Sequence, residues 1–208
     1  VANAGSDYTI PQGTAFKLVG SATDLDERDV LTYSWEQVDD GITTRSTFGP
    51  TKTSGAVWRS RPPSTNPTRY MPVKSRVLSG ELTETNPGVT VDNISWETVS
   101  TVARSLDFAL TVRDRSETNG TGQFPQSDFD FMTVTVDGNS GPFAVISQTA
   151  NETWNVGESQ TVTWDVAGTA SGIVNTPTVN IYLSTDGGLT FPFLAANNVA
   201  NDGSHTFS

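Results

Sequence analysis

The sequence contains no cysteine and only one histidine, His205. Without cysteine, the chain can form neither a disulfide framework nor a thiolate metal site. A Ser-His-Asp triad would have to use His205, which lies close to one end of the chain. The two absences argue against nucleophilic catalysis of the cysteine or the serine type.

Long apolar runs and a basic surface are missing as well. No 18-residue stretch is apolar enough for a membrane-spanning helix, and residues 1–5 do not resemble a signal peptide, so we interpret the chain as part of a longer protein. The 23 acidic residues outnumber the 12 basic ones and give a net charge of −11. Such a surface disfavours nucleic acid but is compatible with bound divalent cations, or simply with solvation by water.

The residues that are abundant favour β-structure. Gly and Pro number 18 and 11, and hydrophobic residues alternate with polar ones in many segments. The clearest alternation places Leu106, Phe108, Leu110 and Val112 on one face of a strand. No segment predicts a helix of more than one turn, which residues 97–105 could form. Short strands separated by turn residues predict an all-β fold of antiparallel sandwiches.

Two tandem sandwich domains are predicted, because six turn- or linker-forming residues, 137–142, interrupt the alternation. The first domain spans residues 1–138 and the second spans residues 142–208. The second domain is short for a seven-strand sandwich of about 100 residues. Its last strand is therefore predicted to be missing, which would leave an open sheet edge.

Residues 41–88 interrupt the pattern of the first domain. The segment contains six prolines and no clear strand except near Tyr70. Because a long structureless segment is unusual in a compact domain, we predict an ordered insertion that packs across one sheet through Trp58, Tyr70 and Met71. Its basic residues could bind an anion, but we expect them to pair with local carboxylates; they are Lys52, Arg59, Arg61, Arg69, Lys74 and Arg76.

Several segments resemble known extracellular modules. Residues 22–37 are similar to the acidic loop and following strand of bacterial cadherin-like and PKD-like modules. The full set, in this order, resembles the region that follows the catalytic domain in secreted bacterial reprolysin-like zinc metallopeptidases: residues 22–37, 66–72, 104–114 with 132–143, and 161–169 with 179–188. The resemblance implies a cadherin- or PKD-like first domain and an Ig- or fibronectin-like second domain.

The catalytic chemistry of that family needs an H-E-x-x-H helix that binds zinc, with the glutamate as general base. One histidine cannot supply it. The resemblance therefore implies a non-catalytic accessory region, secreted or at the bacterial cell surface, whose parent carries the peptidase. The implied partner is the protein or polysaccharide substrate of the parent enzyme, and we expect the region itself to be a monomer.

The strongest candidate site is for calcium. Asp24, Asp26 and Asp29 lie in one loop between two predicted strands. In an antiparallel sandwich this loop shares a pole with the loop that runs from Asp114 to Asp128. Ca²⁺ takes six to eight hard oxygen ligands, which clustered carboxylates supply. We therefore predict a structural Ca²⁺ site formed by these five aspartates.

Other interpretations of the acidic residues stay open. Asp is also common in turns, where it binds backbone amides, and Arg28 places a positive charge inside the first loop. Asp130 is a further candidate ligand. At the opposite pole, Asp39, Asp40 and Asp137 form a weaker candidate site for a cation between the domains.

Residues 184–191 match the Asp-box pattern S-x-D-x-G-x-T-(W/F). The motif resembles a β-hairpin in which the Asp side chain binds backbone amides of the turn and the aromatic residue packs inward. Local turn stabilisation of this kind is a structural mechanism. We therefore predict a structural role, not a catalytic one, for Asp186.

Three functions stay open. The favoured one is a non-catalytic, calcium-stabilised spacer that also binds a substrate or surface. A carbohydrate-binding or adhesin module would present a coplanar row of exposed aromatic residues; Trp58, Trp96 and Trp154 are candidates, although burial is favoured for them. A glycosidase would need two carboxylates about 5–9.5 Å apart in a cleft, and no pair among the 23 acidic residues stands out.

Overall fold

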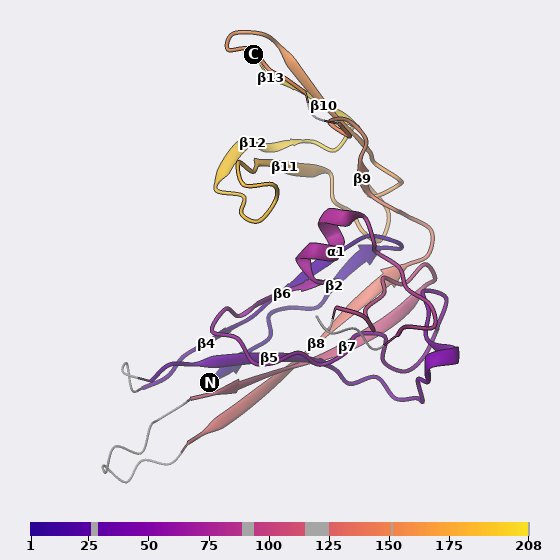
Figure 1. Ribbon diagram of the computed structural model, residues 1–208, viewed down its shortest axis with the longest axis vertical. Coiled ribbons are helices and arrows are strands. Elements are labelled where there is room, and N and C mark those ends of the chain that lie inside the picture. Colours follow the sequence, from indigo (N-terminus) through magenta and orange to yellow (C-terminus); the bar gives the residue numbers. More distant parts are fainter. Residues whose placement is uncertain (26–28, 89–93, 115–124, 151, 208) are drawn as a thin grey trace.

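The computed structural model describes residues 1–25, 29–88, 94–114, 125–150 and 152–207, and it confirms an all-β protein (Figure 1). The strands are β1 (Ala2–Asn3), β2 (Tyr8–Pro11), β3 (Phe16–Val19), β4 (Ser21–Ala22), β5 (Thr32–Gln37), β6 (Thr68–Met71), β7 (Arg104–Arg113), β8 (Ser127–Asp137), β9 (Ala144–Val145), β10 (Gln160–Asp165), β11 (Thr178–Leu183), β12 (Phe193–Ala200) and β13 (Ser204–Phe207). The helical elements are the 3₁₀ turn η1 (Arg45–Thr47) and the helix α1 (Lys74–Ser79). Neither has the length or apolar character that a membrane span requires, and the described residues contain no other helix.

The N-terminal part of the chain (residues 1–137) is built on a four-stranded sheet in the order β2-β8-β7-β5. β7 pairs antiparallel with β8 along its whole length. As predicted, Leu106, Phe108 and Leu110 are fully buried, because alternate residues of a strand point to the same face. One pairing departs from the antiparallel prediction, since β2 runs parallel to β8.

The hydrophobic core lies between this sheet and a layer that contains the β3–β6 pair, which contributes the fully buried Leu18 and Met71. Trp35 is buried, as predicted, and its indole Nε1 donates to the carbonyl of Pro67 at 2.8 Å. Gly20 is required by this packing. A Cβ there would lie 2.4 Å from a methyl carbon of Leu110 and 3.0 Å from the Trp35 ring.

The insertion at residues 41–88 is ordered and packs on the core. Trp58 is buried and meets Phe16 edge to face, with ring centroids 5.6 Å apart. The strand expected near Tyr70 is β6, which pairs antiparallel with β3. The sequence does not predict α1, because this helix depends on tertiary contacts instead of an amphipathic pattern. It contains the buried Arg76 and ends at Gly80, whose φ of 75° is left-handed.

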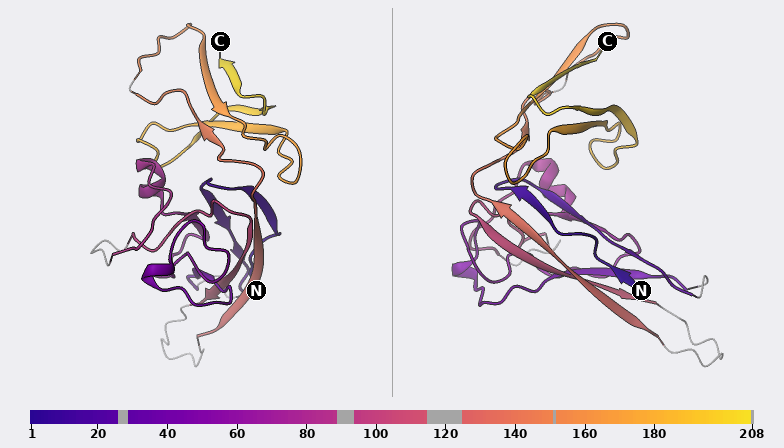
Figure 2. Two further views of the ribbon diagram at one scale, coloured as in Figure 1. Left: turned by 90° about the vertical axis from the view of Figure 1, so that its right-hand side faces the viewer. Right: turned by 180° about the vertical axis from the view of Figure 1, so that it is seen from behind.

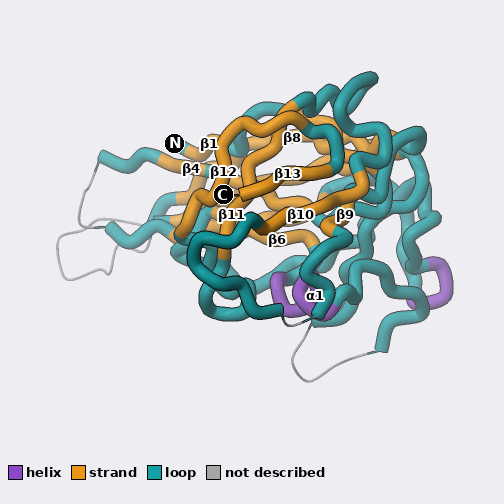
Figure 3. The backbone as a smooth tube through the Cα atoms, turned by 90° about the horizontal axis from the view of Figure 1, so that it is seen from above, coloured by secondary structure: helices purple, strands orange, loops and turns teal. Residues whose placement is uncertain are grey.

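The C-terminal part (residues 144–207) forms two small sheets, β13-β10-β9 and β11-β12. Figures 1 and 2 show these strands beyond α1 and the linker, and Figure 3 shows them projected over the N-terminal part. Trp164, a predicted core residue, is the one buried hydrophobic side chain among the residues described here. Tyr182 and Phe193 are about half exposed. The boundary predicted at residues 138–142 stays a prediction.

The two parts meet near the linker and near α1. Phe143 N–H donates to Thr14 Oγ1 at 3.0 Å beside the linker. Lys74 Nζ, at the start of α1, donates to the carbonyl of Leu189 at 2.5 Å.

Candidate functional site

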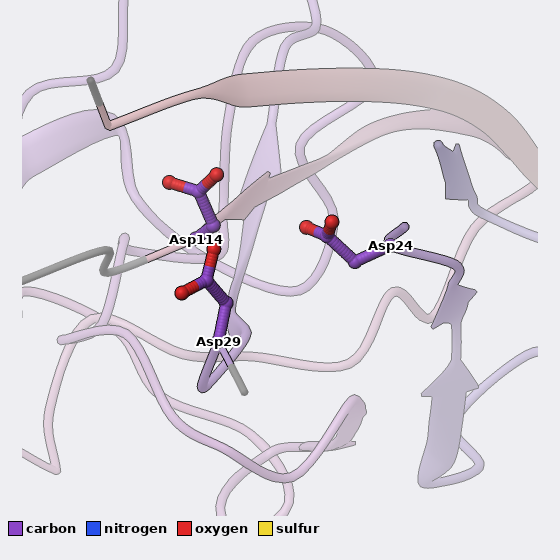
Figure 4. A group of neighbouring side chains, drawn as sticks. All are labelled: Asp24, Asp29 and Asp114. Atoms are coloured by element: carbon purple, nitrogen blue, oxygen red, sulfur yellow. The ribbon is translucent and has the colours of Figure 1, made fainter. Parts of the chain in front are cut away.

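Three of the five predicted calcium ligands come together at one end of the N-terminal part. Asp24 follows β4, Asp29 precedes β5 and Asp114 follows β7. One carboxylate oxygen of each lies within 4.8 Å of the others. Figure 4 shows Asp29 and Asp114 side by side, with the carboxylate of Asp24 directed toward them. We call these three residues the acidic pole.

The spacing of the acidic pole suits Ca²⁺. Because each Ca–O bond is about 2.3–2.6 Å long, oxygens on one ion lie up to about 5 Å apart. Asp114 is held in place by the chain itself: its Oδ1 accepts from Gln126 N–H at 2.7 Å, and its own N–H donates to the carbonyl of Gln126 at 3.2 Å. In the described part of the chain, no other three His, Asp or Glu side chains bring potential ligand atoms within 4.8 Å of one another.

The other two predicted ligands are not part of the acidic pole. Asp26 lies outside the described residues. Asp128 lines the same small cavity as two of the acidic-pole residues, but its Oδ2 accepts from Ala2 N–H at 2.8 Å, which lowers the pKa of Asp128 below its usual range. Asp130 accepts from Ala4 N–H in the same way, at 2.8 Å. These two carboxylates therefore attach the first residues of the chain to β8.

The carboxylates of the opposite pole have structural partners. Asp39 forms an ion pair with Arg104 at 3.1 Å. Asp137 accepts from Ser140 Oγ at 2.7 Å, and this bond lowers the pKa of Asp137. Among the residues that the structure describes, Asp39, Asp40 and Asp137 do not form a metal-ligating group. The weaker candidate site between the domains therefore gains no support.

A buried ion-pair network anchors the insertion, and sequence reasoning did not identify its central residue, Glu97. Glu97 is fully buried, and its Oε1 lies 3.0 Å from Arg69 Nη2 and 3.4 Å from Arg61 Nη1. Its Oε2 accepts from Val73 N–H at 2.8 Å. Arg69 also donates to the carbonyl of Trp35 at 2.5 Å. Burial lowers the pKa of Arg69, and the charge of Glu97 opposes that shift.

Arg76 is held by a similar arrangement. Its guanidinium donates to Glu84 Oε2 at 2.9 Å, to the carbonyl of Glu97 at 2.9 Å and to the carbonyl of Glu81 at 3.0 Å. The expectation that basic residues of the insertion pair with carboxylates is thus confirmed for Arg61, Arg69 and Arg76. The signal in the sequence was the excess of basic residues in the insertion. That excess does not reveal that Arg69 pairs with Glu97, which lies 28 residues away in the sequence.

The Asp-box loop has the hydrogen bonds expected of a structural turn. Asp186 Oδ1 accepts from Thr190 N–H at 2.8 Å, and Ser184 Oγ accepts from Gly188 N–H at 2.7 Å. Bonds from Thr190 and Ser184 lower the pKa of Asp186 to about 2. The expectation that the aromatic residue packs inward is wrong, since Phe191 is 46% exposed. No residue of β11 or β12 is buried, so the hairpin has no core for the ring to enter.

Replacing Asp186 with asparagine is expected to lower the stability of the C-terminal part at neutral pH but not in strong acid. The folded pKa of about 2 lies below the ordinary value of 3.8, so the contribution is present above about pH 4 and is lost as the pH falls toward 2. The D186N melting temperature should lie below that of the wild type at neutral pH and converge with it in acid. Calorimetry across this range tests the effect. D202N is the control, and a gap that stays constant with pH would contradict the prediction.

The aromatic platform proposed from the sequence does not form. Trp58 is buried, Trp96 is partly buried, and Trp154 is 39% exposed in the C-terminal part. Two exposed rings, Phe129 and Phe131, lie near each other on β8. Their centroids are 5.4 Å apart, but the ring planes are inclined by 69° and are not coplanar.

The acidic pole is thus the candidate metal site of the described chain, and the Glu97 network and the Asp-box are structural. The acidic pole is defined by the proximity of three carboxylates, whereas the Glu97 network and the Asp-box are defined by hydrogen bonds and, for Glu97, by ion pairs. Comparisons of the chain with protein-family models, with curated proteins and with solved structures find no match.

Proposed function

We propose that the chain is a non-catalytic, calcium-stabilised spacer of a secreted bacterial protein, and that it also binds a substrate or surface for its parent. The observation that supports calcium is the convergence of Asp24, Asp29 and Asp114 within 4.8 Å. Carboxylates this close repel one another, and a divalent cation would relieve that repulsion. The oxygen chemistry favours Ca²⁺ over softer metals, which prefer nitrogen or sulfur ligands.

An ion at the acidic pole would stabilise the fold directly. Asp29 and Asp114 flank the paired ends of β5 and β7, where Thr32 lies opposite Arg113. Asp24 follows β4 in the segment that leads to β5. Because the unfolded chain does not hold these three groups together, the binding free energy adds to the free energy of unfolding.

Size and chemistry favour a structural role over catalysis at this pole. The cavity beside it has a volume of about 70 Å³, well below the roughly 300–1,000 Å³ of small-molecule sites. His205, the one histidine, lies in β13 and packs edge to face on Phe207 at 4.9 Å. Both observations support a non-catalytic module.

The proposed parent is a secreted reprolysin-like zinc metallopeptidase. This part of the proposal rests on the resemblance of residues 22–37, 104–114 and 161–169 to the region that follows its catalytic domain. The zinc site and its general base would belong to another part of the parent, since this chain has one histidine. A pair of β-sandwiches in series suits a spacer that holds a catalytic domain away from a surface.

Calcium is expected to raise the melting temperature of the N-terminal part. Extracellular calcium modules bind with Kd values of about 10⁻⁴–10⁻³ M. Calcium at about 100 times its Kd adds about 2.7 kcal/mol to the free energy of unfolding, which corresponds to a shift on the order of 10 °C for a unit of this size. Differential scanning fluorimetry in calcium and in EDTA measures the shift.

Two variants make this experiment specific. D29N removes one acidic-pole carboxylate and should abolish most of the calcium response. D40N removes an exposed carboxylate elsewhere in the same part of the chain and should leave the response intact. An unchanged wild-type melting temperature, or an equal response in D29N, would rule out calcium at the acidic pole.

A further inference from the structure

A pocket of about 340 Å³ lies between the residues that flank η1, the segment 56–59 and Trp96. We call it the aromatic pocket. Its described lining includes three aromatic rings, one cation and one hydroxyl: Phe48, Trp58, Trp96, Arg59 and Thr43. The expected row of exposed tryptophans does not form, but two of its three members, Trp58 and Trp96, line this one pocket.

Trp96 is held in a strained backbone conformation. Its φ of 66° is left-handed, which is rare for a bulky side chain and costs about 1–3 kcal/mol. Two hydrogen bonds hold its backbone: Trp96 N–H donates to Glu84 Oε2 at 2.7 Å, and Arg59 N–H donates to Trp96 O at 3.1 Å. Phe48 meets the indole edge to face, with ring centroids 5.3 Å apart. Because strain of this kind is concentrated at functional sites, it points to a binding role for the Trp96 ring.

The partly exposed residues of the pocket can contact a ligand. Phe48 and Trp58 are buried, whereas Thr43, Arg59 and Trp96 are partly exposed. Arg59 Nε is buried and has no hydrogen-bond partner in the described chain. A guanidinium carries five N–H donors, so an acceptor that enters the pocket can receive hydrogen bonds from the outer nitrogens of Arg59.

The main chain of the pocket wall is already paired, which disfavours an extended peptide as the ligand. Val57 N–H and Trp58 N–H both donate to Gln37 Oε1, at 2.6 and 3.0 Å. Arg59 N–H is used by the carbonyl of Trp96. A peptide that adds to a strand needs free main-chain groups, and recognition at this wall must therefore use side chains.

The charges of the chain favour a neutral ligand. The net charge of −11 repels a polyanion such as an acidic polysaccharide. A cation could bind over the aromatic rings, but the guanidinium of Arg59 in the same lining repels it. A neutral ligand that combines apolar surface with hydrogen-bond acceptors meets neither penalty.

We propose that the aromatic pocket binds a β-linked glucose unit of a neutral polysaccharide. The ring hydroxyls of this sugar are all equatorial, so both faces of the ring present apolar C–H groups that suit the large, rigid indole of Trp96. Arg59 donates to the hydroxyls, and Thr43 Oγ1 accepts from them, since its own hydrogen goes to the carbonyl of Ala56 at 2.7 Å.

The size of the aromatic pocket agrees with this ligand. Its volume is at the lower end of the roughly 300–1,000 Å³ of small-molecule sites and suits a single sugar unit. The neighbouring units of the polysaccharide would lie outside it. The inference rests on the binding role proposed above, whose ligand it specifies, and does not depend on calcium.

Titration calorimetry of the whole chain with cellotetraose, a β-1,4-linked glucose tetramer, tests this proposal. W96A should weaken binding at least tenfold, which corresponds to about 1.4 kcal/mol, and R59Q should weaken it about fivefold. Circular dichroism of each variant verifies the fold, and R59Q carries the test if W96A disturbs the packing of Phe48.

Each variant has a matched control outside the aromatic pocket. Trp154 is 39% exposed in the C-terminal part, and Arg45 lies in η1, where its Nε donates to the carbonyl of Asn86 at 3.3 Å. Neither residue lines the pocket. W154A and R45Q should each change the affinity less than twofold, and losses equal to those of W96A and R59Q would contradict the assignment of the site.

Further ligands separate this proposal from its alternatives. A β-1,4-linked mannose tetramer has the same linkage and charge but an axial hydroxyl on each ring, and it should bind at least fivefold more weakly. Absence of cellotetraose binding, equal binding of the mannose tetramer, or tighter binding of the capped peptide Gly-Phe-Pro-Gly would each overturn the proposal. The calcium response of the acidic pole is measured separately and would be unaffected, so the two proposals can fail independently.

Discussion

Replacing Glu97 with alanine is expected to lower the free energy of unfolding by about 3–5 kcal/mol, the usual cost of removing one partner of a buried ion pair. Glu97 is 0% exposed, and its carboxylate accepts hydrogen bonds from Arg69 Nη2 at 3.0 Å and from Val73 N–H at 2.8 Å. Without it, the guanidinium of Arg69, whose side chain is 9% exposed, would lose its ion-pair partner and keep only backbone carbonyl acceptors, and Val73 N–H would lose its acceptor. The insertion would lose the ion pairs that attach it to the segment containing Glu97.

Urea denaturation followed by near-ultraviolet circular dichroism measures this loss. E97Q keeps an oxygen acceptor but removes the charge, and should lose less stability than E97A. E81A is the control: Glu81 is exposed and offers Arg76 only its backbone carbonyl, so its change should stay within about 0.5 kcal/mol. A loss below about 1 kcal/mol in E97A would mean that the network does not anchor the insertion.

The sequence predicts this fold best where strands are long and alternate. The burial of Leu106, Phe108 and Leu110 follows directly from the period of two in β7. β2 contains only four residues, and nothing in its composition specifies that it pairs parallel with β8. α1 could not be predicted because its six residues depend on Gly80 and on long-range bonds of Arg76.

The candidate sites also differ in how well the sequence predicts them. The acidic pole follows from topology, because loops at the same end of a sandwich bring Asp24, Asp29 and Asp114 together. Asp128 has the same residue type, and the sequence predicts it at the end of the second of these loops. It lies instead in β8, and its carboxylate accepts from the backbone of β1, a two-residue strand that the sequence does not predict. Glu97 has no local pattern that distinguishes it from an exposed glutamate, so only the three-dimensional structure identifies it.

Replacing Asn201 with alanine is expected to destabilise the C-terminal part by about 3 kcal/mol, because three side-chain hydrogen bonds are lost at about 1 kcal/mol each. Asn201 Oδ1 accepts from Trp164 Nε1 at 2.8 Å. Its Nδ2 donates to Thr169 Oγ1 at 3.0 Å and to the carbonyl of Thr176 at 2.9 Å. Because Trp164 is the one buried hydrophobic residue described beyond residue 142, these bonds fix the centre of a part that has little other core.

This variant also tests the domain boundary predicted at residues 138–142. If the two parts unfold separately, calorimetry should show two transitions, and N201A should lower the one that belongs to the C-terminal part while the other stays unchanged. N197A is the matched control, since Asn197 is exposed on β12 and its truncation should leave both transitions within about 0.5 kcal/mol of the wild type. A single transition that shifts as a whole in N201A would mean that the contacts of Phe143 with Thr14 and of Lys74 with Leu189 couple both sandwiches into one cooperative unit. In that case the two parts would unfold as one cooperative unit, and calcium bound at the acidic pole would stabilise the full length of the described chain.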